Sequence, residues 1–160
     1  MRIIAIDPGY ERLGIAVLER VPRQKETLLY STCIQTAKTL AREKRLLAIA
    51  DAIAETIAKW KPEALAIETL FLHTNQKTAM PVAEARGAVL VEAARAGLPV
   101  HEYTPLQIKI AVTGYGRSDK RQVMEMVKKL VALPPQKRLD DEYDAIAVGL
   151  TCFASNKWNR

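Results

Sequence analysis

The first third of the chain is organised as short apolar runs separated by polar breaks. Runs of strand length occupy 2–7 (RIIAID), 13–20 (LGIAVLER) and 27–36 (TLLYSTCIQT). The breaks between them, PGY and PRQKE, are short, and strands joined by such connections run antiparallel. This part of the sequence therefore predicts a three-stranded antiparallel sheet.

Helical periodicity begins after these strands. Apolar residues recur at the spacing of one helix face from Leu46 to Trp60, and Pro62 marks the end of this helix. The apolar strand ALAIE at 64–68 follows a helix long enough to cross the sheet, so it can lie parallel to the first strand. We therefore expect Asp7 and Glu68, which end these two strands, at the same edge of the sheet.

One further strand and several helices complete the predicted architecture. A helix over about 78–96 contains Gly87, whose cost of about 1 kcal/mol relative to Ala indicates a backbone contact with the sheet or a second subunit. PVHEYT at 99–104 gives the fifth strand. The element order predicts an α/β fold with a mixed five-stranded sheet flanked by helices. With 160 residues, 49% of them apolar, the chain fits one domain, 1–160.

Capping signals mark the last three helices. Thr104 is expected to cap a helix that ends at Gly114, because Pro105 and Gln107 complete a first-turn proline and a capping box. Ser118 is expected to cap the next helix. LPPQKRL separates that helix from the final one, which begins near DEYD at 141–144.

Four acidic residues lie where apolar segments begin or end. Asp7 and Glu68 end strands, and Asp141 and Asp144 would share one face of the last helix. Carboxylates that converge repel one another unless protons or cations offset the repulsion. Without His or Cys neighbours they suit Mg²⁺ or Mn²⁺, and two such ions about 4 Å apart can hydrolyse a phosphodiester. Singly, each acid could instead cap a turn or a helix.

The charge of the chain favours a polyanionic partner. Lys and Arg number 24 against 18 acids, giving a net charge of +6. Eight of the basic residues between the second and third of the four acids could form a phosphate-binding face, although solvated helix surfaces explain them equally well. They are Lys109, Arg117, Lys120, Arg121, Lys128, Lys129, Lys137 and Arg138.

The two cysteines and the absence of long apolar runs suggest an intracellular protein. Cys33 and Cys152 show no CxxC spacing, so both are expected to be reduced core residues. No run is long enough to span a membrane, and the N-terminus reads directly into a strand without a signal-peptide pattern. We therefore expect no membrane association and a cytoplasmic location.

Five ordered motifs make the chain resemble the RuvC family of Holliday junction resolvases, within the ribonuclease H-like superfamily. They are IDPGYERLGIAV within 3–17, AIETLFLHTN at 66–75, ARGAVLVEA at 85–93, TPLQIKIAVTGYGRSDKRQV at 104–123 and DEYDAIAVGLT at 141–151. The resemblance implies a homodimer that binds four-way DNA junctions and makes two symmetric nicks with Mg²⁺. It also implies that branch-migration proteins RuvA and RuvB are possible partners, in DNA recombination and repair.

The same resemblance assigns roles to individual residues. The metal ligands and catalytic acids are Asp7, Glu68, Asp141 and Asp144. The DNA-binding residues are Phe71, Lys109, Lys120, Arg117 and Arg121, with Lys120 at the phosphate being cut and Phe71 stacking on exposed bases at the junction centre. His73 and Tyr143 receive no role. Asp140 and Glu142 are expected to point away from the site.

Other interpretations stay open at this stage. Phe71 and Leu72 could simply continue the buried strand after Glu68. The chain could be a nuclease that acts on structured RNA, or a junction-binding module that no longer turns over. An ATPase is disfavoured because the sequence lacks a GxxxxGK phosphate loop.

Overall fold

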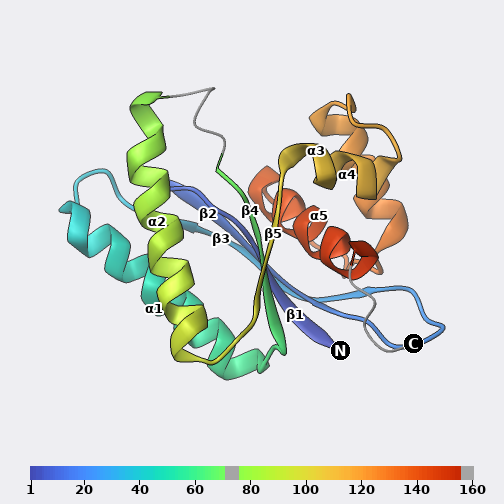
Figure 1. The fold of residues 1–160 in the computed structure, drawn as a ribbon, viewed down its shortest axis with the longest axis horizontal. Helices are drawn as coiled ribbons and strands as arrows, with labels where there is room; N and C mark the ends of the chain where they lie inside the picture. Colours follow the sequence, from blue (N-terminus) through green and yellow to red (C-terminus); the bar gives the residue numbers. More distant parts are fainter. Residues whose placement is uncertain (71–75, 156–160) are drawn as a thin grey trace.

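The computed structural model describes residues 1–70 and 76–155. Strands and helices follow one another as drawn in Figure 1. In chain order they are β1 (Arg2–Asp7), β2 (Arg12–Glu19), β3 (Thr27–Gln35), α1 (Arg42–Trp60), β4 (Ala64–Glu68), α2 (Gln76–Arg95), β5 (Val100–Tyr103), α3 (Pro105–Thr113), α4 (Lys120–Leu130) and α5 (Asp140–Ser155).

The strands form one mixed sheet in the order β3-β2-β1-β4-β5. β1 pairs antiparallel with β2, and β2 with β3, as the short connections predicted. β4 lies parallel to β1, with Ile6 opposite Ile67, and β5 lies parallel to β4. The predicted α/β fold with its antiparallel first three strands is confirmed. Because β1 and β4 run in the same direction, Asp7 and Glu68 emerge at one edge.

Helices cover both faces of the sheet. Figure 1 shows α1 and α2 on one side and α3, α4 and α5 on the other. β1 is buried between these layers, so its side chains alternate between two cores, which is the period of a strand. Ile4 and Ile6 pack toward α1 and α2, whereas Ile3 and Ala5 pack toward α5. This explains why RIIAID is apolar at successive positions.

α5 is the most deeply buried helix on its side. Every residue from Ala145 to Phe153 is buried. Gly149 allows the helix to approach the sheet closely, because a Cβ there would lie 2.5 Å from Leu18 Cδ1 and 3.2 Å from the Cβ of Ala5. The position of α5 relative to β1 and β2 is therefore tightly fixed.

The cap of α4 differs from the sequence prediction. Asp119, rather than Ser118, is the N-cap: its side chain accepts a hydrogen bond from the Gln122 amide at 2.8 Å, and the Gln122 side chain accepts one from the Asp119 amide at 2.9 Å. The Ser118 hydroxyl instead donates to the Tyr115 carbonyl at 2.8 Å. Both residue types cap helices well, but the Ser118 hydroxyl is already bonded within the loop that precedes the helix.

Three smaller expectations also need correction. Of the two contacts predicted for Gly87, the one with the sheet is wrong, because outside its own helix no described atom lies within 4 Å of the position of a Cβ there, and the one with a second subunit stays a prediction. α1 begins at Arg42, one turn before the apolar pattern that starts at Leu46. Cys152 is a buried free thiol as expected, but Cys33 is only partly buried. Among the described helices, none is long and apolar enough to cross a membrane.

Candidate active site

The four acids meet where β1 and β4 end and α5 begins. Asp7 and Glu68 come from neighbouring strands, and their side chains lie within hydrogen-bonding distance of each other. Asp141 and Asp144 lie on the first turns of α5. All three other acids act electrostatically on Asp7. The sheet register and the helix therefore bring together residues that are up to 137 positions apart in sequence.

A glycine on β2 lets the helix reach the strand ends. Gly14 pairs with Asp7 across the β1–β2 ladder. Its missing side chain leaves room for the main chain of Asp141, whose carbonyl would overlap any Cβ at this position. The glycine is thus the physical link between the strand acids and the helix acids, because it lets α5 start directly beside the end of β1.

The acids strongly disfavour one another's ionisation. Burial raises the pKa of Asp7 well above its usual range, and the carboxylates of Asp144, Glu68 and Asp141 add to the rise. Burial, followed by repulsion from Asp144, raises the pKa of Glu68 to about 7. A hydrogen bond between the carboxyl groups of Asp7 and Glu68 requires a proton on one of them. The site therefore needs protons or cations to be stable.

Two basic side chains already offset part of this charge. Lys120 Nζ lies 2.9 Å from Asp144 Oδ2, and it opposes the rise that burial causes in the pKa of Asp144. Arg12, at the start of β2, forms an ion pair with Asp141. The two helix acids therefore point toward cations of the protein as well as toward Asp7.

The chemistry of these side chains fits a hard divalent cation. As they stand, no three of the described His, Cys, Asp and Glu side chains are gathered tightly enough to hold one ion. The pairing of Asp141 and Asp144 with basic groups accounts for this, since each is drawn toward its partner. The donors are carboxylate oxygens whose mutual repulsion a divalent ion would offset, and oxygen ligands are those that Mg²⁺ prefers.

A pocket of about 220 Å³ opens beside the acids. Lys109 of α3 and Lys120 of α4 line it together with Glu68 and Asp144. The capping boxes at Thr104 and Asp119 fix the starts of the two helices that carry these lysines. The full lining consists of Glu68, Pro105, Ile108, Lys109, Lys120, Val123, Asp144 and Ala147. Such a pocket can hold a phosphate group between cationic side chains and the acids.

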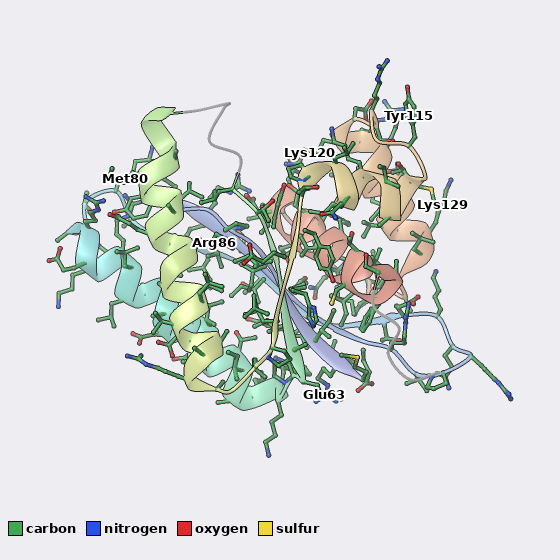
Figure 2. All side chains as sticks on the ribbon, viewed as in Figure 1. Glu63, Met80, Arg86, Tyr115, Lys120 and Lys129 are labelled. Atoms are coloured by element: carbon green, nitrogen blue, oxygen red, sulfur yellow. The ribbon has the colours of Figure 1, made fainter. Side chains whose placement is uncertain are left out.

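Two other predicted DNA-binding residues, Arg117 and Arg121, lie elsewhere. Arg117 and Arg121 are exposed near the start of α4 and do not line the pocket. Lys129, on the same helix, lies on the outer side of the molecule in Figure 2, whereas Lys120 lies toward the sheet. Phe71 and His73 fall outside the described residues. The structure therefore brings two of the eight basic residues, Lys109 and Lys120, into the pocket beside the acids.

Sequence reasoning missed two charged residues around the acids, Arg12 and Asp140. Arg12 pairs with Asp141 although no motif singled it out. Asp140, which was expected to point away, lies 3.8 Å from Lys120. Glu142 does point away from the acids, but it is buried and accepts hydrogen bonds from the Ser31 hydroxyl at 2.5 Å and the Leu139 amide at 3.0 Å. It ties the start of α5 to β3.

Tyr143, which lies between the two helix acids in sequence, is a structural residue. It packs against the core on the α5 side of the sheet. Its ring centroid lies 5.7 Å from Lys128 Nζ, at the outer end of α4. Its neighbours are thus helix residues rather than the acids.

The sequence of this chain matches a known protein family. The family model for crossover junction endodeoxyribonuclease RuvC matches residues 3–152. The chain is similar to the RuvC proteins of Thermosipho melanesiensis, at 45% identity over 92% of this chain and 94% of the relative, and of Moorella thermoacetica, at 44% identity over 97% and 92%.

Solved structures agree with the sequence comparison. The structure of Thermus thermophilus RuvC in complex with Holliday junction substrate superposes with a TM-score of 0.87 at 34% identity, covering 94% of this chain and 92% of that one. The yeast mitochondrial Holliday junction resolvase Ydc2 shares the fold, with a TM-score of 0.68 at 10% identity over 95% and 78% of the two chains. The resemblance inferred from the five motifs is confirmed, and the chain belongs to the RuvC family of crossover junction endodeoxyribonucleases.

Proposed function

We propose that this protein resolves four-way (Holliday) DNA junctions by paired, symmetric nicks that depend on two Mg²⁺ ions per active site, with Mn²⁺ able to substitute. The observation that carries the proposal is the convergence of Asp7, Glu68, Asp141 and Asp144 beside a pocket lined by Lys109 and Lys120. The Thermus thermophilus relative, solved with a Holliday junction substrate, supports the choice of DNA.

Each group of residues has a distinct task in this proposal. The four acids would hold the ions, and the bound ions would supply the activation of a water and the stabilisation of the leaving oxygen of the phosphodiester. Lys109 and Lys120 bind the phosphate beside them, where their charges stabilise the charge that develops on its oxygens. Lys120 is well placed for this task because it already contacts Asp144 at 2.9 Å.

The remaining partners follow from the chemistry of the junction and from the family. A four-way junction has two equivalent strands to cut, and a homodimer presents two identical sites related by a two-fold axis. We place Phe71 at the junction centre and Arg117 and Arg121 on the DNA arms. RuvA and RuvB are proposed as branch-migration partners by family analogy, with 1–160 acting as one nuclease domain in the cytoplasm.

The decisive experiment is cleavage of a synthetic four-way junction by an Asp7→Asn variant. We expect junction binding to persist and nicking to fall at least about 1,000-fold, because the variant loses a central metal-binding carboxylate while the basic side chains remain. Asp51→Asn, an exposed position on α1, makes the same chemical change away from the site and should leave nicking unchanged.

Substrate choice is tested in parallel with duplex DNA and RNA hairpins under Mg²⁺. Nicking of the four-way junction in preference to both supports the proposal. Full cleavage by Asp7→Asn would show that the acid cluster is not needed for catalysis. Preferential cleavage of RNA would show that the substrate is structured RNA rather than a DNA junction.

A further inference from the structure

The acid cluster has a basic side chain on each of two sides. Lys120 comes from α4 and contacts Asp144 from the side of the pocket, beyond which β4 and β5 lie. Arg12 comes from β2, the neighbour of β1 on the opposite side, and contacts Asp141. A nucleic acid strand that crosses the acids would therefore meet a cation before and after the cut position.

The backbone of Arg12 is fixed in the sheet, whereas its side chain is partly exposed to solvent. It is the first residue of β2, opposite Gln35 in the ladder, and two residues before the glycine that supports Asp141. Its side chain is 48% exposed, against 19% for Asp141. The backbone position is thus fixed by the sheet, while the guanidinium reaches the surface at the rim of the site.

Among the described residues, the Arg12 guanidinium has two polar partners, so part of its hydrogen-bonding capacity stays open to a ligand. A guanidinium carries five donors in a planar fork that matches a carboxylate or a phosphate. Here one side of it meets Asp141, and its other polar neighbour is the thiol of Cys33, a weak acceptor. The group can therefore bind a phosphate without losing strong contacts other than the one to Asp141.

The ion pair between Arg12 and Asp141 conflicts with metal binding by the same carboxylate. A divalent ion on Asp141 would lie within a few ångströms of the guanidinium, and like charges at that distance repel strongly. Lys120 faces a similar conflict at Asp144. Both side chains are about half exposed, at 48% for Arg12 and 55% for Lys120, so the tip of Arg12 can turn outward to where a DNA phosphate would lie.

We propose that Arg12 is a phosphate-binding residue of the nuclease, held by Asp141 in the free protein and transferred to a backbone phosphate of the bound strand when Asp141 takes a metal ion. This inference rests on the proposed function, since it assumes that Asp141 is a metal ligand. Arg12 on β2 and Lys120 on α4 would then contact the same DNA strand from two sides of the acids.

The test compares junction binding by Arg12→Gln with and without a divalent ion. Ca²⁺ replaces Mg²⁺ so that binding is measured without turnover, and EDTA provides the ion-free condition. Arg23→Gln is the matched control, because Arg23 is an exposed arginine in the turn between β2 and β3, at the far end of the hairpin. Both variants lower the net charge by one.

With Ca²⁺, Arg12→Gln should bind the junction roughly 3- to 10-fold more weakly than Arg23→Gln, and its logarithmic salt dependence should be shallower by about one. In EDTA the two variants should bind alike, because Asp141 then holds Arg12. Calorimetry with Mg²⁺ and no DNA should show that Arg12→Gln binds the ion at least as tightly as the wild type.

Arg12→Lys keeps the charge but not the planar fork and should recover part of the Ca²⁺-dependent loss. Equal binding by Arg12→Gln and Arg23→Gln in Ca²⁺ would overturn the inference, and so would a loss of the same size in EDTA. The proposed function is read separately, from the wild-type preference for four-way over duplex DNA. If that preference were missing, the Arg12 comparison would be made on whichever DNA the wild type binds.

Discussion

Asp7 and Glu68 end strands inside the sheet, whereas Asp141 and Asp144 lie on the first turns of α5, and the two pairs balance their charges differently. The strand acids face each other and other acids, and burial raises the pKa of both. Each helix acid has a basic partner, Arg12 for Asp141 and Lys120 for Asp144. The strand acids therefore depend more on external cations or protons, while each helix acid has a direct ion pair within the protein.

This difference separates two roles within one site. A pair of acids without basic partners strains the metal-free protein and so favours ion binding. In the pair with basic partners, Lys120 offsets part of the rise that burial causes in the pKa of Asp144, and two cations lie close to where a phosphate would arrive. Repulsion between the acids at the strand ends thus lowers the stability of the metal-free folded state, and a bound ion would offset this repulsion.

Among the tests of this comparison, the largest expected effect comes from removing the cation of a helix acid. Lys120→Ala should lower the single-turnover nicking rate about 100-fold, because it removes a positive charge that acts on the phosphate during cleavage. Lys128→Ala is the matched control, since Lys128 pairs with Glu125 on the same helix. An equal rate for the two variants would mean that Lys120 serves only to neutralise Asp144.

A change of pH should affect the strand acids in the metal-free protein. The pKa of Glu68 is about 7 in the folded protein, against an ordinary value of 4.5, so the folded state binds the proton more tightly. This contribution to stability is complete below pH 4.5 and is lost as the pH rises through 7. We expect the free energy of unfolding to fall by about 1 to 3 kcal/mol across this window.

Urea unfolding in EDTA at pH 5 and pH 8 measures this loss. Glu68→Gln should remove much of the pH dependence, whereas Glu55→Gln, exposed on α1, should not. Added Mg²⁺ should restore the stability of the wild type at pH 8 more than that of Glu68→Gln. A flat pH profile for the wild type would show that the strand acids are not strained.

The smallest expected effect tests the link between the two pairs of acids. Gly14→Ala places a Cβ against the main chain of Asp141 and should lower the free energy of unfolding by about 1 to 2 kcal/mol. It should also weaken Mg²⁺ binding measured by calorimetry, because α5 moves away from the strand ends. Gly87→Ala, with open space at its Cβ, should be neutral or stabilising. Equal behaviour of the two variants would contradict the close approach at Gly14.

The sequence was sufficient to predict where the four acids lie, because local rules decide that outcome. A strand period places Asp7 and Glu68 at strand ends, a helical crossover makes those strands parallel, and a spacing of three puts Asp141 and Asp144 on one helix face. The five motifs then carried the family assignment. Each of these signals is contained in a short segment or in the order of segments.

The rest depends on contacts between segments that no local pattern encodes. Arg12 reaches Asp141 only because the β1–β2 register and the bare Gly14 bring α5 close to the hairpin. Ser118 and Asp119 are adjacent and equally suited to capping, and the choice between them follows from the loop that binds the serine hydroxyl. Asp140 approaches Lys120 because α4 packs beside α5.

The uninterrupted burial of α5 has a consequence for how the site is lost. Its residues from Ala145 to Phe153 are all enclosed, so we expect its amide protons to be among the slowest to exchange with solvent. The first turns that carry two of the acids are anchored to this core. Opening of this core would therefore also displace Asp141 and Asp144 from the strand acids.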